Sequence, residues 1–255
     1  MKTLNRWIVE SAEQWDVSPR VARWVFWAPI IGLVVVAAAR VDKGFYRFLL
    51  EDDGPVEWAQ FACFIVASLA AAGVAFQRFR AGFKWQALLF VVFTLGMFVI
   101  AGEEIAWGQR LLGFETPAEL EAVNLQGEIT WHNIVGVLGV VNIVMMLVGL
   151  GGAAAYWLNK RLRVERYWDL ANYLFVPPFF LTACFWIIFL YRLFRLVIWR
   201  DSGFTITKFG EWPELCLAFG LGAFAWLNYR RLAAKPLAPV AVSESVVVSQ
   251  PGQFS

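Results

Sequence analysis

Two adjacent glutamates and the only histidine of the chain have the side chains best suited to acid–base chemistry. Glu103 and Glu104 close one long apolar run, and His132 opens the next. Carboxylates crowded at the edge of a low-dielectric region favour keeping a proton on one of them, and an imidazole titrates near neutral pH. Glu103, Glu104 and His132 are therefore candidate catalytic residues, with His132 or one of the two glutamates as general base.

Three further glutamates, each at the start of an apolar run, are candidate metal ligands. They are Glu57, Glu211 and Glu214. A divalent ion held by carboxylates and one imidazole would be magnesium, manganese or iron rather than structural zinc. The alternative is that these acids are first-turn residues of helices, where the helix dipole stabilises a negative charge by about 0.3 to 1 kcal/mol. The sequence leaves both interpretations open.

Polar, basic and aromatic residues near these acids could bind an anionic substrate. The candidates are Trp107, Gln109, Arg110, Asn133, Arg192 and Arg195. A helix that continued past Glu104 would bring Arg110 to the same face as Glu103, so a structural ion pair is the alternative for Arg110. Arg192 and Arg195 form a basic stripe on an apolar run, which could reach lipid phosphates or pair with the acidic residues. The alternative is that the stripe belongs to a long, tilted helix.

The composition places these residues in a membrane protein. The chain has 255 residues, of which 60% are hydrophobic and 16% are charged, and its mean hydropathy is +0.58. Soluble domains are close to half apolar and a quarter charged, so this composition excludes disorder and favours the membrane as solvent. The net charge of +2 does not indicate a nucleic-acid partner, and three isolated cysteines predict neither a disulfide framework nor a zinc site.

Six segments are long and apolar enough to cross a bilayer, which takes about 20 residues. They are residues 25–39, which can extend back to residue 21 if the side chain of Arg23 reaches the interface, and residues 57–77, 85–102, 133–157, 170–190 and 212–229. We therefore expect an all-α fold, a polytopic bundle of six transmembrane helices over residues 19–232. Residues 1–18 are expected to form a cytoplasmic amphipathic segment, and residues 233–255 a disordered cytoplasmic tail.

The loop charges predict how these spans are oriented. One set of termini and connections carries 14 of the 22 Lys and Arg residues, and the opposite set carries 14 of the 20 acids. Because positively charged loops stay in the cytoplasm, we expect both termini to be cytoplasmic and the acids and His132 to be extracytoplasmic. Charged residues interrupt the apolar core that a cleavable signal peptide needs, so the first span should direct insertion.

The connection between the third and fourth predicted spans contains a helix-start pattern. Thr116, Pro117 and Glu119 match a capping box with proline at the first helical position. We therefore expect a short extracytoplasmic helix over residues 117–126, lying as a lid over the two adjacent glutamates.

One run is distinctive enough to suggest a family. Residues 102–110 read Gly-Glu-Glu-Ile-Ala-Trp-Gly-Gln-Arg, followed by Phe-Glu-Thr-Pro from residue 114 and by His-Asn at 132–133. This pattern resembles a family of uncharacterised bacterial multi-pass membrane proteins. The resemblance implies a bacterial inner-membrane location and no established activity.

Two classes of function fit the sequence. The first is a lipid-modifying or lipid-handling enzyme whose Glu/His site faces the extracytoplasmic side, with membrane lipids as its partners. The alternative is a non-catalytic scaffold, accessory subunit or transport component, in which acids and bases pair and the lid binds another membrane protein. Transport is disfavoured because the predicted spans carry no acid or base near their centres. The sequence contains no Gly-rich phosphate loop or nucleophile motif that would decide between the two classes.

Overall fold

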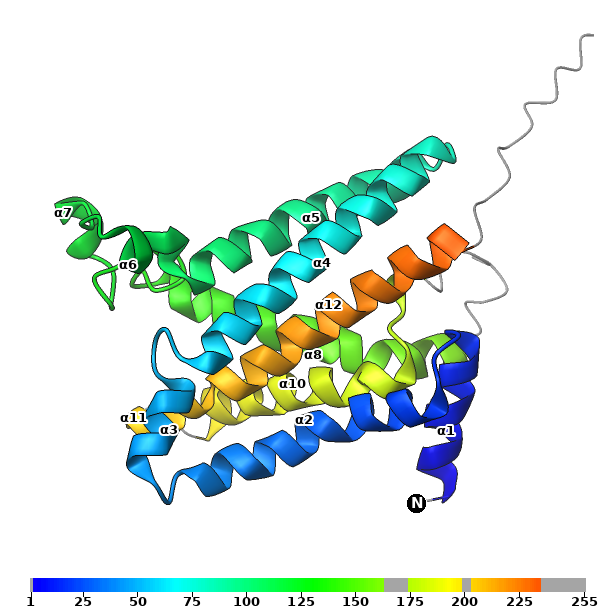
Figure 1. The fold of residues 1–255 in the computed structure, drawn as a ribbon, viewed down its shortest axis with the longest axis horizontal. Coiled ribbons are helices and arrows are strands. Elements are labelled where there is room, and N and C mark those ends of the chain that lie inside the picture. The colour runs from blue at the N-terminus through cyan, green and yellow to red at the C-terminus, as the bar shows by residue number, and fades with distance from the viewer. Residues whose placement is uncertain (1, 163–173, 199–202, 235–255) are drawn as a thin grey trace, which may run out of the picture.

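The structure, a computed structural model, describes residues 2–162, 174–198 and 203–234. The regular elements in these ranges are helices, and the one β-type pairing found there is an isolated bridge between Asn124 and Ile134. The predicted all-α fold is therefore confirmed (Figure 1).

Five helical segments are long and apolar enough to cross a membrane. They are α2 (Pro19–Ala39), α4 (Pro55–Arg80) with the short α3 (Lys43–Leu50) before it, α5 (Lys84–Glu104), α8 (Val137–Leu162), and α10 (Thr182–Val197) with the 3-10 turn Phe179–Leu181 before it. Much of their apolar surface faces outward, since only 11% of the apolar window of α8 is buried within the protein. Outward apolar surface of this extent is typical of helices that contact lipid.

The sixth predicted span corresponds to α12 (Glu211–Ala234), which is not apolar enough to be counted with those five. It runs through the middle of the bundle, where it packs against α4 and α10 (Figure 1). Small residues make this close packing possible: a Cβ on Gly222 would lie only 2.9 Å from the carbonyl oxygen of Cys63. A helix enclosed by its neighbours needs less apolar surface than one that faces lipid.

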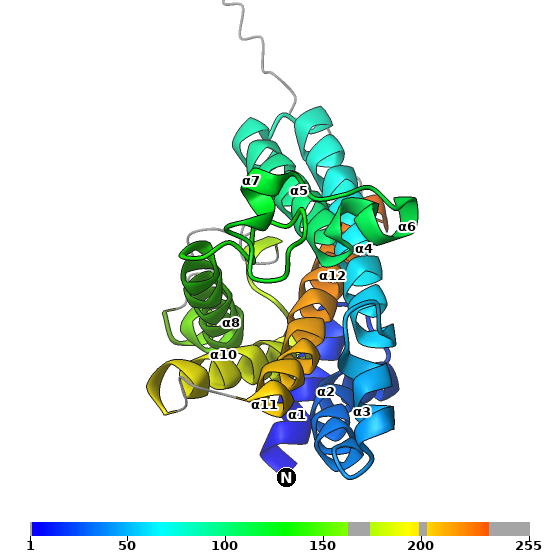
Figure 2. The same ribbon diagram turned by 90° about the vertical axis from the view of Figure 1, so that its left-hand side faces the viewer.

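The helices alternate in direction, so the bundle has two chemically different ends. At the end that we call acidic, α4 and α12 begin and α5 and α10 end. The opposite, basic end carries Arg78, Arg80, Lys160, Arg161, Arg230 and Arg231. Figure 2 looks onto the acidic end, where α6 (Gln109–Leu112) and α7 (Ala118–Glu121) lie near α4 and α5, and α11 (Phe204–Phe209) lies near α10 and α12.

The boundaries of the fifth span differ from those predicted. Pro178 is extended, with φ −62° and ψ 151°, and the continuous helix starts only at Thr182 and runs on to Val197. Consecutive prolines remove two backbone donors and disfavour helix for the residue before each of them, so they start a new helix here instead of bending a long one. The first predicted residues of this span, 170–173, lie outside the described ranges.

The amphipathic N-terminal segment forms α1 (Lys2–Gln14), which is docked on the basic end of the bundle (Figure 1). Ile8 and Trp15 are buried in the same core cluster as Phe179. The hydroxyl of Ser11 accepts a hydrogen bond from the backbone N–H of Phe179 at 2.8 Å. The apolar face of this helix is therefore used for packing against the protein. Of the predicted disordered tail, residues 235–255 lie outside the described ranges, and α12 extends to Ala234.

Candidate functional site

Five glutamates meet at the acidic end and form what we call the carboxylate cluster. Glu104 closes α5, and its carboxyl group is within electrostatic range of Glu57, Glu103, Glu211 and Glu214. Glu57 lies in the first turn of α4, and Glu211 and Glu214 lie in the first turn of α12. His132 lies beside the cluster, in the connection that leads to α8. The structure thus brings together the acids and the histidine that the sequence singled out.

The end of α5 is a sharp turn and not a continued helix. Ala106 and Trp107 have φ values of 44° and 54°, and Gly108 follows at 78°. This left-handed backbone is unfavourable for residues other than glycine, so the turn needs support from side-chain contacts. It folds the indole of Trp107 back onto Gly102, where an added Cβ would lie 2.7 Å from the ring. The predicted continuation of the helix to Arg110 is therefore wrong.

Glu103 ties this turn to the chain that precedes α8. Its carboxylate accepts hydrogen bonds from the indole N–H of Trp107 at 2.7 Å and from the backbone N–H groups of Trp131 and His132 at 2.6 and 3.1 Å. The imidazole Nδ1 of His132 lies 3.1 Å from the same carboxylate. We call this set of contacts the Glu103 clasp. Glu103 is thus a structural acceptor with a side chain only 11% exposed.

The clasp also fixes how the imidazole can act. An ionised carboxylate is only an acceptor, so Nδ1 of His132 must carry the hydrogen that it shares with Glu103. In the neutral imidazole the acceptor lone pair is then on Nε2, which makes no hydrogen bond to any of the described residues. The side chain of His132 is 34% exposed. This pair has the geometry of a carboxylate that positions a histidine base.

Arg110 does not pair with Glu103, which corrects the predicted ion pair. Its guanidinium lies 2.7 Å from Asp53, 2.8 Å from Glu128 and 3.8 Å from Glu57. Burial disfavours the charged form, but the hydrogen bond to Asp53 and the charges of Glu128 and Glu57 outweigh it and raise the pKa of Arg110. Because the α5 helix stops at residue 104, Arg110 points toward the start of α4. Its donors are engaged there instead of being free for a substrate.

Gln109 and Thr116 cross-link the cap, the name we give to residues 105–136. The amide of Gln109 donates to the Thr116 hydroxyl at 2.6 Å and accepts from the backbone N–H of Ile129 at 2.9 Å. The Thr116 hydroxyl donates to the carbonyl of Gly127 at 2.7 Å. Thr116 therefore does not cap a helix, and the predicted capping box is wrong.

The lid helix is also much shorter than predicted. Instead of residues 117–126, only the single turn of α7 (Ala118–Glu121) is helical. The side chain of Asn124 accepts from the backbone N–H of Gln126 at 2.9 Å and donates to the carbonyl of Thr130 at 2.6 Å. Such local side-chain bonds offer the backbone an alternative to helix. Glu103 is contacted by residues 107, 131 and 132 of the cap, and not by the lid helix.

Two predicted substrate-binding residues have structural positions in the cap. Asn133 is only 8% exposed, and its amide donates to Gln126 and, at 3.2 Å, to the Thr130 hydroxyl. Trp107 is held by Glu103, although 40% of its surface remains exposed. The buried polar groups of the cap are therefore used mainly to bind each other.

The two arginines of α10 separate. Arg192 donates to Glu214 at 2.6 Å and contacts the sulfur of Met145 at 3.1 Å. Arg195 points instead toward α11, where it lies 3.5 Å from the Thr207 hydroxyl. The two members of the predicted basic stripe thus have different partners, and Arg192 neutralises part of the carboxylate cluster.

Two residues that pair with the cluster were not predicted. Gln60 is fully buried, and its amide donates to the backbone carbonyl and the carboxylate of Glu211 at 2.7 and 3.3 Å. Its spacing of three residues from Glu57 on one helix face could have indicated this position. Lys208 contacts Asp52 and lies 3.8 Å from Glu211. Burial opposes its charge, but these acids raise the pKa of Lys208.

Glu104 differs from the other members of the carboxylate cluster. Each of the other four contacts at least one of the partners Asp53, Gln60, Trp107, Arg110, Trp131, His132, Arg192 and Lys208. Within the described ranges, Glu104 is half-buried and has no hydrogen-bond or ion-pair partner. It is therefore the one carboxyl group of the cluster that no described residue engages.

The described residues contain no group of three or more His, Cys, Asp or Glu side chains arranged to hold a metal ion. Glu57, Glu211 and Glu214 are engaged with an arginine, a lysine or an amide. The divalent metal and its proposed ligands stay a prediction from the sequence, and they play no part in the function proposed below.

Comparison of the chain with protein-family models, with curated proteins and with solved structures found no match. The bacterial family that residues 102–110 resemble therefore stays a prediction. Function has to be inferred from the geometry of the acidic end.

Proposed function

We propose that this protein is a six-span, lipid-modifying or lipid-handling membrane protein whose polar site is centred on Glu104 and faces the extracytoplasmic side. The orientation rests on the basic residues gathered at the end where α1 lies, which would place both termini in the cytoplasm. The resemblance of residues 102–110 favours a bacterial inner membrane. The observation that carries the proposal is the unpartnered carboxyl group of Glu104 among four partnered ones.

In this proposal Glu104 and His132 exchange protons with the substrate. Five neighbouring carboxylates at a low-dielectric edge are costly to ionise together, so the cluster is suited to holding a proton. The Nε2 lone pair of His132 is a second proton acceptor, and Glu103 is a positioning residue that orients the imidazole. The proposed chemistry is therefore an acid–base step on a membrane-borne substrate.

The exposed surface of the cap supports a lipid as that substrate. Large apolar side chains project from it: Leu112 is 77% exposed, Trp131 is 71% exposed and Leu111 is 68% exposed. Tryptophan is enriched at the membrane–water interface, and exposed apolar groups of this kind favour contact with a bilayer. Trp131 directly precedes His132, so lipid bound along this surface would reach the proposed base.

A non-catalytic scaffold is the second candidate, and one observation favours it. Most of the distinctive run at residues 102–110 is engaged in holding the cap: Gly102 seats Trp107, Glu103 forms the clasp, and Gln109 and Arg110 bind other segments. In this case the exposed apolar surface of the cap would bind another membrane protein.

The two candidates are separated by Glu104→Gln, with Glu121→Gln on the exposed surface of α7 as the matched control. In a host lacking the protein, each variant is compared with wild type for abundance and for membrane lipid composition by mass spectrometry. We expect Glu104→Gln to restore abundance but not lipid composition, and the control to restore both. If deletion changes the lipids and Glu104→Gln restores them fully, Glu104 is not the catalytic group. If deletion leaves the lipids unchanged, the scaffold is favoured.

A further inference from the structure

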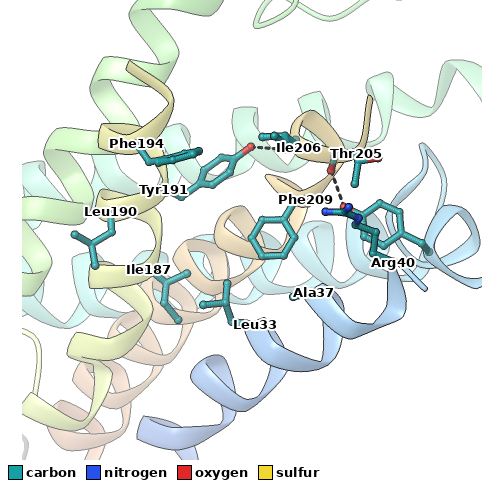
Figure 3. Close-up of a pocket in the computed structure, with 11 residues that line it drawn as sticks. Leu33, Ala37, Arg40, Ile187, Leu190, Tyr191, Phe194, Thr205, Ile206 and Phe209 are labelled. Atoms are coloured by element: carbon teal, nitrogen blue, oxygen red, sulfur yellow. Dashed lines mark hydrogen bonds between the residues drawn. The ribbon is translucent and has the colours of Figure 1, made fainter. Parts of the chain in front are cut away.

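A second site at the acidic end is an apolar cavity of about 470 Å³ between α2, α10, α3 and α11 (Figure 3). Its apolar wall is formed by Leu33, Ala37, Ile187, Leu190, Phe194 and Phe209. The volume lies within the range of about 300 to 1,000 Å³ found for small-molecule sites. None of the lining residues belongs to the carboxylate cluster, so this cavity is distinct from the site proposed above.

The polar groups in the cavity wall are used to hold α11 in place. The hydroxyl of Tyr46 donates to the carbonyl of Thr205 at 2.7 Å, and that of Tyr191 donates to the carbonyl of Ile206 at 2.9 Å (Figure 3). Gly210 packs closely against the same tyrosine, since an added Cβ at this position would lie 2.7 Å from the Tyr191 hydroxyl. With both tyrosines engaged, the space favours a hydrocarbon occupant over a polar one.

Arg40 supplies a positive charge at the same cavity. It is an exposed residue at the end of α2 and lines the cavity together with Tyr46 and Thr205. The helix C-terminus favours a cation there but leaves the side-chain donors of the guanidinium unused. Among the described residues Arg40 has no acidic partner, whereas Arg110, Arg192 and Lys208 each have one. A phosphate would satisfy the planar fork of these donors.

We infer that this cavity binds one hydrocarbon chain of an anionic phospholipid, with Arg40 holding the phosphate. The exposed apolar side chains of Val34 and Val35 on α2, at 65% and 55%, continue the apolar wall into the surface that lipid would cover. A membrane supplies such a ligand in the plane where the end of α2 would lie. The inference concerns binding only and does not depend on chemistry at Glu104.

The first test measures lipid retained by the purified full-length protein in native mass spectrometry, with dioleoyl phosphatidylglycerol and dioleoyl phosphatidylcholine as probes. Ala37→Phe fills the cavity, and Ala38→Phe adds the same group to the next exposed position of α2, which does not line it. We expect Ala37→Phe to lose retention of both lipids and Ala38→Phe to keep it. Equal retention by the two variants would overturn the inference.

Arg40→Gln tests the contribution of the charge. Loss of one charge-assisted phosphate contact should reduce the preference for phosphatidylglycerol roughly tenfold. Arg161→Gln, which removes an exposed charge at the basic end, should leave the preference unchanged. An unchanged preference in Arg40→Gln would show that Arg40 does not hold the phosphate.

A measurement on the unaltered protein covers the case in which Ala37→Phe fails to fold. Phosphatidylglycerol that carries a photoreactive group in its acyl chain should label the α10 residues that line the cavity, Ile187, Leu190, Tyr191 and Phe194. Label distributed evenly over the outward faces of α5 and α8, with none at these four residues, would contradict the inference. Because this readout requires no activity, its failure would leave the proposed role of Glu104 untouched.

Discussion

The last two residues of α5, Glu103 and Glu104, have the same side chain but different surroundings. On the side that faces the cap, Glu103 accepts from Trp107 and from two backbone N–H groups of residues 131 and 132. On the side that faces α4 and α12, Glu104 lies within electrostatic range of three carboxylates, those of Glu57, Glu211 and Glu214, and contacts no donor among the described residues. Two identical neighbours in the sequence thus differ because the helix directs them into different surroundings.

This difference separates a residue that builds the structure from one that we propose acts on a substrate. A buried carboxylate with several donors stabilises the fold, and its removal leaves those donors unsatisfied. A half-buried carboxyl without a partner gains no such stabilisation. Variants of Glu103 should therefore mainly lower stability, whereas variants of Glu104 should mainly impair function.

The largest effect on stability is expected from Glu103→Ala. Removal of the carboxylate leaves the donors of the clasp without an acceptor, which should destabilise the cap by about 3 kcal/mol. Amide hydrogen exchange should accelerate across residues 105–136 and much less in α2. Glu121→Ala, on the exposed face of α7, is the control and should change nothing. Unchanged hydrogen exchange in the cap of Glu103→Ala would show that the Glu103 clasp does not stabilise the cap.

A somewhat smaller effect is expected from Gly102→Ala. The new Cβ would lie 2.7 Å from the ring of Trp107, so the indole must move, at a cost of about 1 to 3 kcal/mol. Gly96→Ala is a matched control in the same helix, because no atom lies within 4 Å of its added Cβ. There alanine should be neutral or stabilising, by up to about 1 kcal/mol. Thermal unfolding that finds the same shift for both variants would contradict the seating of Trp107 on Gly102.

The combination of Glu103→Gln with Arg110→Gln distinguishes the observed pairing from the one expected for a continuous helix. Since Arg110 binds Asp53 and Glu128 instead of Glu103, the two losses should add to within about 0.5 kcal/mol. Recovery of stability in the double variant relative to either single variant would show that the two side chains pair after all. Thermal unfolding of the three variants provides the comparison.

The smallest effect is expected from Thr116→Val, which removes the hydroxyl between Gln109 and Gly127. The loss should be about 1 kcal/mol, and Thr116→Ser should avoid most of it. Hydrogen exchange should increase at residues 127–129, next to the lost contacts. If it increased at residues 118–121 alone, Thr116 would be acting as the helix cap that the sequence pattern suggested.

The bundle was largely predictable from the sequence because membrane-crossing helices are defined by local composition. The helices α4 and α5 begin and end within a few residues of the predicted 57–77 and 85–102. The start of α10 was not predictable from hydropathy, since the two prolines interrupt the helix within an apolar run. Hydropathy also could not show that α12 is enclosed by its neighbours, because that depends on packing between distant segments.

The residues of the site were predictable, but their partners were not. Convergence of the acids followed from the alternation of the helices. The cap, in contrast, depends on contacts such as the one between Gln109 and Ile129, which are twenty residues apart. The left-handed backbone at Trp107 is unusual for a residue other than glycine, so residue propensities do not predict it. A local pattern such as the capping box at Thr116 is therefore overridden by distant contacts.

The central claim is that Glu104, alone among the five glutamates, is an available carboxyl group. An apolar carbodiimide adds to protonated carboxyl groups in apolar surroundings, and the modified residue can be identified by mass spectrometry of the full-length protein in membranes. We expect Glu104 to be modified, and we expect this modification to be lost in Glu104→Gln and to persist in Glu121→Gln. Modification of Glu103 or of the paired acids Glu57, Glu211 and Glu214, with Glu104 unmodified, would contradict the central claim.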